Sequence, residues 1–411
     1  MSSWMAAADP LYAHGVSWAV LIILVIRLFI AFGVLMTAVI FMIWFERKTI
    51  SDMQSRIGPE RWGPFGLLQT VADGIKLIFK EDLIPAQADR FVFKLAPYLV
   101  VVPAFITFAI VPVGGTMTIA GHTVQLQVAD PPMGILLMLA MSGISVYGVM
   151  LAGWSSGSKY PLISSVRASA QMISYEAALG MTIVTIVLAT GSLNTHDIVT
   201  AQAHGIWHWN VIRLGIVPFV VFLIAITAEL NRPPFDVVES ESELVGGFAT
   251  EYSSFRFAIF YLAEYINTIT MSAIMVTLFF GGPAGWAPPI PHFKWVFPII
   301  WFLLKTTIFA FSYVWFRASL PRFRYDQLMD LGWKRLIPLS LGWMLLVAGF
   351  LISRAWGFLM GALVLFAWFL LLRAFDLGAT RAASDSSVLA TVGERPIPGP
   401  VLRAMTDGEE Q

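Results

Sequence analysis

The sequence predicts an all-α, polytopic membrane protein with about nine transmembrane helices and one further amphipathic helix at the cytoplasmic interface. Apolar residues make up 57% of its 411 positions and charged residues 13%, and the mean hydropathy is +0.75. A chain that folds around a single core in water does not reach this apolar content. Long apolar runs recur along the chain, and Lys and Arg gather in alternate connections between them. Both patterns are typical of helices that cross a bilayer in turn.

Nine apolar runs meet the length that a bilayer requires. A hydrocarbon core needs about 20 apolar residues per helix, because each unpaired backbone group in hydrocarbon costs several kcal/mol. The runs lie near residues 17–45, 95–112, 133–152, 175–190, 211–228, 257–280, 296–316, 336–353 and 355–372. We group them as a single transmembrane domain over residues 1–375. The tail at 376–411 has too few apolar groups to offset the entropy of ordering, so we expect it to be disordered.

The distribution of positive charge predicts the orientation in the membrane. The connections on one side of the runs, together with the tail, hold 21 of the 26 Lys and Arg residues. Cytoplasmic loops carry such an excess, so this side is predicted to be cytoplasmic and the N-terminus to lie outside. The predicted cytoplasmic loops are 46–94, 153–174, 229–256 and 317–335. The first fifteen residues hold no Lys or Arg, which favours an uncleaved anchor over a signal peptide.

The first cytoplasmic loop contains an apolar pattern with helical period. From Pro64 to Lys80, apolar residues recur three and four positions apart, and polar residues such as Asp73 and Lys76 fall on the opposite face. Such a helix lies in the membrane interface with its apolar face toward lipid or protein. It is either an ordinary surface helix or part of the wall of a cavity that opens at the membrane surface.

The loop after the fifth run is acidic, although it borders the membrane on the side that is rich in positive charge. It reads ELNRPPFDVVESESELVGGFATEYSSFR. Its acidic residues, which face only two Arg, are Glu229, Asp236, Glu239, Glu241, Glu243 and Glu251. The loop is either a solvated acidic segment or a segment folded back into the protein. In the second case, close carboxylates in a desolvated site have raised pKa values and form a cluster that takes up and releases protons.

Ionisable residues also occur within or at the ends of the apolar runs. Glu176 begins the fourth run, and Glu264 lies about two turns inside the sixth. Lys305 and Arg27 lie deep within the seventh and first runs. A charge at mid-bilayer costs about 2.5–3.5 kcal/mol on insertion scales, so we expect these side chains to face protein or water. Together with the acidic loop they indicate a hydrophilic path into the membrane.

Basic and aromatic residues alternate in the last cytoplasmic loop. It reads FRASLPRFRYDQLMDLGWKR and contains Arg317, Arg322 and Arg324. The pattern is either the ordinary interfacial belt of a membrane protein or a basic rim. A basic rim would suit docking of a peripheral subunit or polarisation of a bound carbonyl group.

The residue types that hold redox metals are absent or unsuitably placed. The chain has no Cys, so by itself it supplies no thiolate ligands for an iron–sulfur cluster. All six His residues fall outside the predicted spans, which excludes an intramembrane pair for haem. His204 and His208 are spaced as i and i+4, but nothing supplies a third ligand, and we predict no metal site. The zero net charge argues against nucleic acid as a partner.

Four long segments resemble one known family. They are FERKTISDMQSRIGPERWGPFGLLQTVADGIKLIFKED, GWSSGSKYPLISSVRASAQMISYEAALG, AELNRPPFDVVESESELVGGFATEYSSFRFAIFYLAEY and FRASLPRFRYDQLMDLGWK. In this order they resemble the H subunit of proton-translocating NADH:quinone oxidoreductase, respiratory complex I, which is called subunit 1 in the mitochondrial enzyme. The resemblance runs from about residue 44 to residue 335 and omits the ninth run and the tail. Within it, Ser158, Pro161, Ser164 and Ser165 depart from the residues that are usual in the family.

The resemblance implies a membrane subunit of an oxidoreductase that carries no redox centre and is not catalytic alone. Such a subunit forms the membrane end of a quinone-binding chamber and couples quinone reduction to proton translocation. Quinone would be the substrate, and this chain alone would bind no metal, haem or iron–sulfur cluster. The partners would be other complex I subunits, among them the peripheral iron–sulfur and quinone-site subunits and small membrane subunits, in lipid of the bacterial plasma membrane.

The resemblance also assigns residues by motif. Those that would line the chamber near its entrance are Glu46, Arg47, Arg56, Asp73 and Lys76. Those that would form the acidic coupling path are Glu176, Glu229, Glu239, Glu241, Glu243, Glu251 and Glu264. We add the intramembrane Lys305 as a candidate for the same path. Arg317, Arg322 and Arg324 would support the inner loops and the docked arm.

Two other functions are weighed against this one. The first is the equivalent subunit of a membrane-bound hydrogenase or formate hydrogenlyase, which uses no quinone. The amphipathic helix with its charged entrance favours the quinone version. The second is a self-standing secondary transporter, which predicts inverted repeats and a glycine-broken helix pair. The sequence shows neither pattern.

Overall fold

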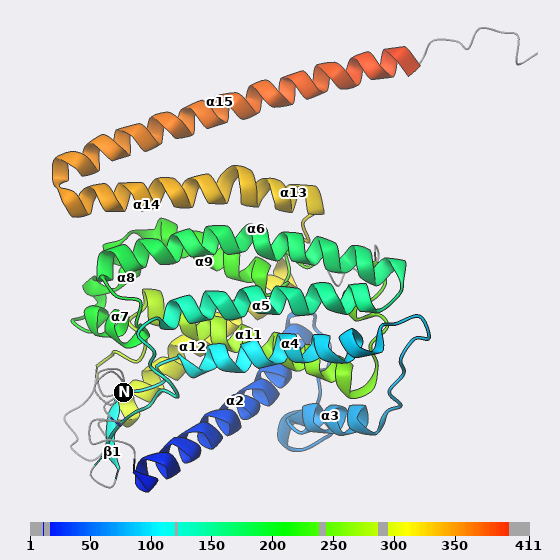
Figure 1. Cartoon of the computed structure of the whole chain (residues 1–411), viewed down its shortest axis with the longest axis vertical. Coiled ribbons are helices and arrows are strands. Elements are labelled where there is room, and N and C mark those ends of the chain that lie inside the picture. Colours follow the sequence, from blue (N-terminus) through cyan, green and yellow to red (C-terminus); the bar gives the residue numbers. More distant parts are fainter. Residues whose placement is uncertain (1–10, 12–16, 120–121, 238–243, 287–294, 394–411) are drawn as a thin grey trace, which may run out of the picture. The chain divides into compact units, whose positions relative to one another are not determined.

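The computed structural model describes residues 11, 17–119, 122–237, 244–286 and 295–393. The chain divides into two units, residues 1–348 and 349–411, which we describe separately. Almost every described element is a helix, as Figure 1 shows, so the predicted all-α membrane class is confirmed.

The first unit contains the long helices α2 (Trp18–Met53), α4 (Arg90–Ala109), α5 (Gly134–Ser155), α6 (Lys159–Thr190), α9 (Ile216–Glu229), α11 (Ser254–Phe279), α12 (Val296–Ser319) and most of α14 (Ile337–Ile352). The shorter elements are η2 (Pro64–Gly66), α3 (Gln69–Phe79), β1 (Thr116–Ile119), β2 (His122–Gln125), α7 (Thr195–Gln202), η3 (Ile206–His208), α8 (Asn210–Arg213), η4 (Gly247–Ala249), α13 (Tyr325–Asp330) and the π-helix η6 (Leu331–Leu336). The strands β1 and β2 form one antiparallel hairpin, with Thr116 opposite Gln125.

Eight helices within the described residues are long and apolar enough to cross a membrane, and each coincides with one of the predicted runs. The fifth predicted run, 211–228, is the exception. It forms α8 and the 14-residue α9, which is about 21 Å long at 1.5 Å per residue and therefore shorter than a hydrocarbon core of about 30 Å. Of the nine expected transmembrane helices, eight are therefore present as long apolar helices among the described residues, and the remaining one is the short apolar helix α9.

The break in this run has an identifiable structural cause. Gly215 adopts φ +86, a left-handed conformation that few other residues tolerate. A Cβ at Gly215 would lie 2.8 Å from the indole of Trp343. The same indole donates a hydrogen bond of 2.9 Å to the carbonyl of Leu214, which the helix break leaves without a helical partner. Gly215 therefore interrupts the run between α8 and α9, where α14 approaches it.

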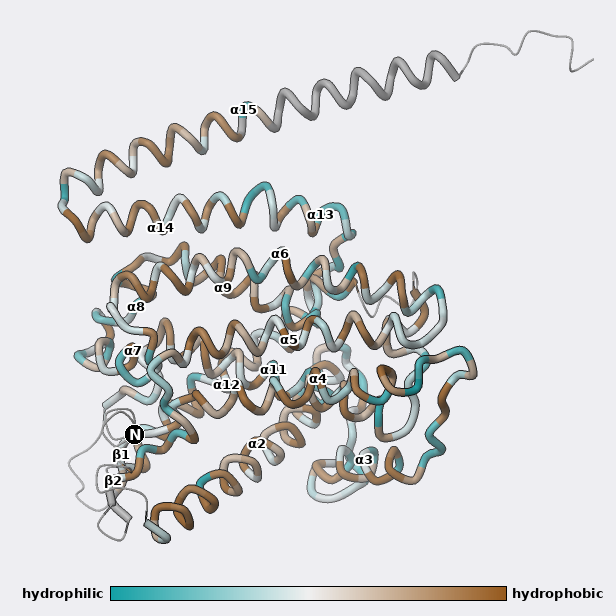
Figure 2. Tube along the Cα trace, viewed as in Figure 1, coloured by the Kyte–Doolittle hydropathy of each residue, from teal (hydrophilic) through white to brown (hydrophobic). Residues whose placement is uncertain are grey.

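The helices α4, α5 and α6 pack in sequence, and α11 packs against α4 and α12 (Figure 1). Of the eight long helices, α11 is the most buried and α2 is among the least buried. Figure 2 shows that α2 is brown, and hence apolar, along much of its length, as expected for a helix that faces lipid. The core of the unit contains buried tyrosines, among them Tyr175, Tyr265 and Tyr313. Polar groups are therefore present deep within the bundle.

The amphipathic helix expected at Pro64–Lys80 is present as η2 followed by α3. Its apolar face is exposed in the first unit, with Ile75, Ile78 and Phe79 more than half accessible. The C-terminal end of α3 is held by Ser254, whose hydroxyl lies 2.7 Å from the carbonyl oxygen of Lys80. The helix is thus attached to the start of α11 and presents an apolar surface to lipid or protein.

The second unit contains the end of α14 and the helix α15 (Arg354–Gly393). The rings of Phe350 and Phe358 lie 5.7 Å apart across the turn between the two helices. The last turn of α14 therefore packs against the start of α15. The first unit ends at residue 348, and the single transmembrane domain over residues 1–375 stays a prediction. Within α15, the first part, Arg354–Leu371, has the composition of a span. The helix continues through Gly393 into the predicted disordered tail, and residues 394–411 lie outside the described residues.

Candidate functional site

A buried network of two carboxylates and two guanidinium groups lies where α2, α11, α12 and the loop after α9 meet. Arg232 Nη1 lies 2.9 Å from Glu46 Oε2, and Arg232 Nε lies 2.8 Å from Glu264 Oε1. Arg317 pairs with the other oxygen of Glu46. The side chains of Arg232 and Glu46 are 3% and 4% accessible, and that of Glu264 is 24% accessible. Arg232 therefore bridges an acid on the first long helix to an acid on α11.

The charge of Arg232 is strongly maintained. Burial opposes ionisation of its guanidinium, but the carboxylates of Glu264 and Glu46 outweigh this and hold the pKa of Arg232 well above its ordinary value. The guanidinium also lies 4.7 Å from the ring centroid of Tyr265, at a distance that suits a cation–π contact. Arg232 is thus a permanent positive charge between the carboxylates of Glu46 and Glu264.

The loop that carries Arg232 is folded into the protein. The side-chain amide of Gln171, on α6, donates hydrogen bonds of 2.8 Å to the carbonyls of Ala228 and Phe235, on either side of Arg232. Asp236 is buried and pairs with Arg322 at 3.0 Å. Of the two alternatives for this loop, inward folding is therefore the observed one for residues 229–237.

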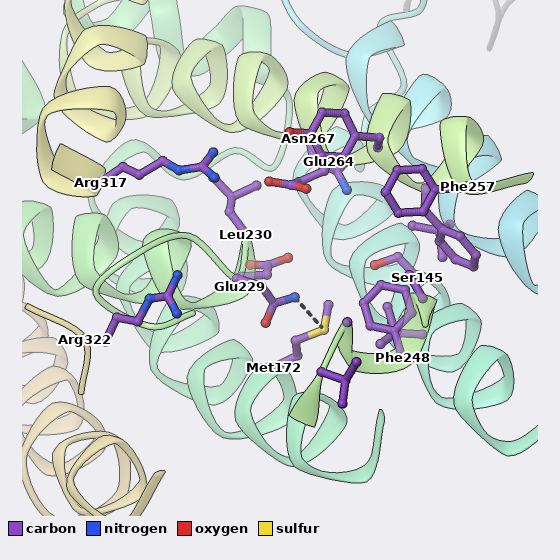
Figure 3. A pocket seen from close by; sticks show the side chains of 18 residues that line it. Ser145, Met172, Glu229, Leu230, Phe248, Phe257, Glu264, Asn267, Arg317 and Arg322 are labelled. Atoms are coloured by element: carbon purple, nitrogen blue, oxygen red, sulfur yellow. Dashed lines mark hydrogen bonds between the residues drawn. The ribbon is translucent and has the colours of Figure 1, made fainter. Parts of the chain in front are cut away.

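A cavity of about 380 Å³ lies beside this network. Figure 3 shows the side chains of Glu229, Glu264, Asn267, Arg317 and Arg322 around it. Aromatic side chains complete the lining: Phe248, Phe257, Phe260 and Tyr261. The cavity is therefore charged on one side and apolar on the other, which suits an amphipathic molecule or a chain of water molecules.

Glu229 is the innermost acid of the cavity. It ends α9 with only 7% of its surface accessible, and the hydroxyl of Ser142, on α5, donates a hydrogen bond to its Oε1. Glu176 on α6 is close enough to interact with it electrostatically. The carboxylate of Glu176 lies against Gly143, where an added Cβ would be 3.6 Å from its Oε1. These acids continue the charged groups of the cavity toward α5 and α6.

Comparison with known proteins identifies the family. Residues 26–348 match the family model described as NADH dehydrogenase. The H subunit of NADH-quinone oxidoreductase from Frankia casuarinae is 49% identical over 84% of this chain and 76% of its own length. An H subunit of NADH-quinone oxidoreductase from Koribacter versatilis, the one numbered 2, is 45% identical over 80% of this chain and 97% of its own length. The chain belongs to the family of NADH-quinone oxidoreductase H subunits.

This membership confirms the resemblance that the four sequence segments predicted. The family match ends at residue 348, where the first structural unit also ends. A third relative, the H subunit of NADH-quinone oxidoreductase from Cutibacterium acnes, is 44% identical over 87% of this chain and 82% of its own length. The network and the cavity lie entirely within the matched region.

The five residues assigned by motif to the chamber entrance fall into three groups in this member of the family. Glu46 is part of the buried network, whereas the neighbouring Arg47 pairs with Asp73 of α3 at 2.7 Å. Arg56 and Lys76 are exposed, and Arg56 donates to Gln54 at 2.7 Å. Among the described residues that line the cavity there is none from α3. The wall role of the amphipathic helix therefore stays a prediction.

The acids assigned to the coupling path are also divided. Glu229 and Glu264 share the cavity, and Glu176 lies next to Glu229. Glu239, Glu241 and Glu243 lie outside the described residues. Glu251 is partly buried and is absent from the described lining of the cavity. The structure thus brings together three acids of the seven that the family pattern named.

Lys305 occupies a different place from the acidic path. Its ammonium group donates to the carbonyls of Phe280, Gly282 and Ala284 at 2.7–3.0 Å. These carbonyls follow the C-terminal end of α11, about 24 Å along the helix from Glu264. The position explains how a lysine is tolerated within a span, because three carbonyl oxygens replace its hydration.

The sequence interpretation omitted several residues of the site. Asn267 lies one helical turn from Glu264 and lines the same cavity, a position that the i, i+3 spacing on α11 would have indicated. Ser142 and Gln171 had no such signal, because their partners are more than fifty residues away in the chain. Within the described residues, no group of three or more His, Cys, Asp or Glu side chains is arranged to hold a metal ion.

Proposed function

We propose that this chain is the membrane subunit of an NADH-quinone oxidoreductase that forms the membrane end of the quinone-binding chamber and couples quinone reduction to proton translocation. The membership in the family of H subunits supports the assignment to such a complex. The chemistry of the redox step would take place at an iron–sulfur cluster of a neighbouring peripheral subunit. The chain itself would confine the quinone and respond to its charge.

The observation that carries this proposal is the position of Arg232. It pairs with Glu46 of α2, which also pairs with Arg317 of α12, and with Glu264, which lines the cavity. A charge that develops on a reduced quinone near Glu46 would change the strength of the ion pairs in this network, because electrostatic interactions are strong where water is excluded. The proton affinity of Glu264 and then Glu229 would change in response.

The cavity supports proton transfer as the second part of the function. Glu229 and Glu264 both line it, and Glu176 extends the acids toward α5 and α6. A set of coupled carboxylates takes up and releases protons in steps that belong to the group as a whole. Protons released here would pass to antiporter-like membrane subunits of the complex. The remaining acids of the path would be Glu239, Glu241, Glu243 and Glu251.

The entrance of the chamber would lie near Glu46 and Arg47, which are consecutive on α2. Arg47, paired with Asp73, ties α2 to the amphipathic helix α3. This side of the bundle would face the cytoplasm, with the N-terminus outside and the protein in the bacterial plasma membrane. Partners would be the peripheral iron–sulfur and quinone-site subunits and small membrane subunits. The basic residues Arg322 and Arg324 would support the docked arm.

The test uses the assembled complex in proteoliposomes. Glu229→Gln keeps the shape of the side chain but removes its titratable proton, so proton translocation per NADH oxidised is expected to fall severalfold. The matched control is Asp82→Asn, since Asp82 is an accessible acid that pairs with Arg256 at 2.9 Å away from the cavity. Full proton translocation in the Glu229→Gln complex would contradict the proposal.

The equivalent subunit of a membrane-bound hydrogenase or formate hydrogenlyase is the alternative. The relatives from Frankia, Cutibacterium and Koribacter are all named as components of quinone oxidoreductases, which favours the quinone version. Isolation of the complex in mild detergent would separate the two, because only the hydrogenase would contain a nickel-containing peripheral subunit.

A further inference from the structure

A second, much smaller cavity lies beside Glu229 between α4, α5, α6 and α11. Its volume is about 20 Å³, and a water molecule needs about 10–15 Å³ measured in this way. Its polar lining residues are Thr107, Ser142, Ser145, Glu229 and Asn267. A site of this size with five polar neighbours can hold one water molecule, since an internal water makes two to four hydrogen bonds.

The three hydroxyl groups of the cavity direct their protons elsewhere. Thr107 donates to the carbonyl of Pro103 at 2.8 Å, and Ser145 donates to the carbonyl of Ser142 at 2.7 Å. Ser142 donates to Glu229 Oε1. Each hydroxyl has one proton, so all three present only acceptor lone pairs to the cavity.

The remaining two polar groups are an acceptor without a donor and a donor without an acceptor. Glu229 Oε2 is buried and accepts no hydrogen bond from any described residue, a costly situation for a buried carboxyl oxygen. Asn267 lines both cavities, and its carboxamide makes no hydrogen bond with the described part of the chain. Its NH₂ group is therefore the hydrogen-bond donor that this lining presents to a bound molecule.

We propose that the small cavity is a binding site for a single water molecule and that Asn267 is its positioning residue. The water accepts a hydrogen bond from the Asn267 carboxamide. It donates one hydrogen bond to Glu229 Oε2 and the other to a hydroxyl oxygen of Thr107 or Ser145. This arrangement satisfies the carboxyl oxygen of Glu229 and uses the donor that the hydroxyl groups do not supply.

The small cavity adjoins the larger one, because Glu229, Ser145 and Asn267 belong to the lining of both. A water held by Asn267 therefore lies between the innermost acid and the larger space that Glu264 faces. The role of this water in proton transfer rests on the proposed function. Its presence at Glu229 rests only on the geometry and on the count of donors and acceptors.

The first experiment is a high-resolution cryo-EM map of the assembled complex. A single ordered density within hydrogen-bonding distance of Glu229 and Asn267 is expected. Asn267→Leu should remove it, whereas Asn267→Gln, which is similar in size and retains an amide donor, should keep it. Met271→Leu is the control, because Met271 is an apolar residue of the same wall and the exchange conserves volume. A well-resolved wild-type cavity without this density, or density that persists in Asn267→Leu, would overturn the proposal.

The second experiment measures proton translocation by the same variants. Asn267→Leu should lower the rate of proton translocation by about tenfold, which corresponds to about 1.4 kcal/mol, the order of one hydrogen bond. Asn267→Gln should retain most of it. If Glu229→Gln abolishes translocation but Asn267→Leu equals the Met271→Leu control, the water-mediated step is wrong and the proposed function stands. If Glu229→Gln translocates fully, the proposed function fails, while the map still decides whether the water site exists.

Discussion

Replacement of Arg232 by Leu tests whether the buried network is a single electrostatic unit. The guanidinium lies 2.9 Å from Glu46 and 2.8 Å from Glu264, and its side chain is 3% accessible. Removing one partner of a buried ion pair costs about 3–5 kcal/mol, because it leaves charge without compensation in a desolvated site. Arg317 still pairs with Glu46, so the expected loss for Arg232→Leu lies toward the lower end of this range.

A double-mutant cycle with Glu264→Gln measures the coupling energy between Arg232 and Glu264. The second substitution neutralises one of the carboxylates that Arg232 compensated, so the double variant should regain about 1–2 kcal/mol relative to Arg232→Leu. The free energy of unfolding is measured on the full chain in dodecyl maltoside by titration with SDS. The fluorescence of the 15 Trp residues reports the transition.

Lys334→Gln provides the matched control. Lys334 pairs with Asp330 at 2.7 Å, but their side chains are 49% and 62% accessible, and exposed pairs contribute about 0–1 kcal/mol. Arg232→Leu should therefore destabilise the chain severalfold more than Lys334→Gln. Equal effects of the two substitutions, or additive effects of Arg232→Leu and Glu264→Gln, would refute the idea of one coupled network.

Three further substitutions test other parts of the structure. Lys305→Met removes the donor to three carbonyls after α11, so stability should fall by about 1–3 kcal/mol, while the ratio of protons translocated to NADH oxidised is unchanged in complexes that assemble; a changed ratio would return Lys305 to the acidic path. Gln171→Leu removes the amide that holds both sides of the Arg232 loop, and limited proteolysis should then cleave this loop faster than in the wild type. An unchanged cleavage rate would show that other contacts hold the loop. Burial raises the pKa of the Tyr252 phenol to about 12 from an ordinary value of 10.0, so folding favours the neutral form, and the stability this contributes is complete below pH 10 and is lost as the pH rises toward 12. Tyr252→Phe should flatten the loss of stability over that pH window in SDS titrations, and an identical pH profile would contradict the assignment.

Patterns within short stretches of sequence predicted the elements whose formation depends on local composition. Eight spans and the helix α3 follow from the length and period of apolar runs, because lipid requires each crossing segment to satisfy its own backbone. The same patterns did not locate the break at Gly215. That break depends on Trp343, which is distant in the sequence and supplies both the steric limit and the hydrogen bond to Leu214.

The candidate site was predicted in part, for a related reason. Motifs named Glu46, Glu229 and Glu264 as functional residues but did not show that Arg232 joins Glu46 to Glu264. Arg232 and Glu46 are 186 positions apart, and only the packing of the helices brings them together. Lys305 was assigned to the acidic path because it is a charge within a span, and the fold instead places it against carbonyl groups.

The sequence by itself determined that this chain is a helical membrane protein, where most of its helices lie and to which family it belongs. These properties depend on composition, on period and on the order of neighbouring residues, all of which are written along the chain. Only the tertiary structure decided which charges meet, which acids share a cavity and which hydroxyl groups have a proton to offer. Such contacts join residues of different helices, and their energies depend on distance and on the exclusion of water, which the packing of the helices sets.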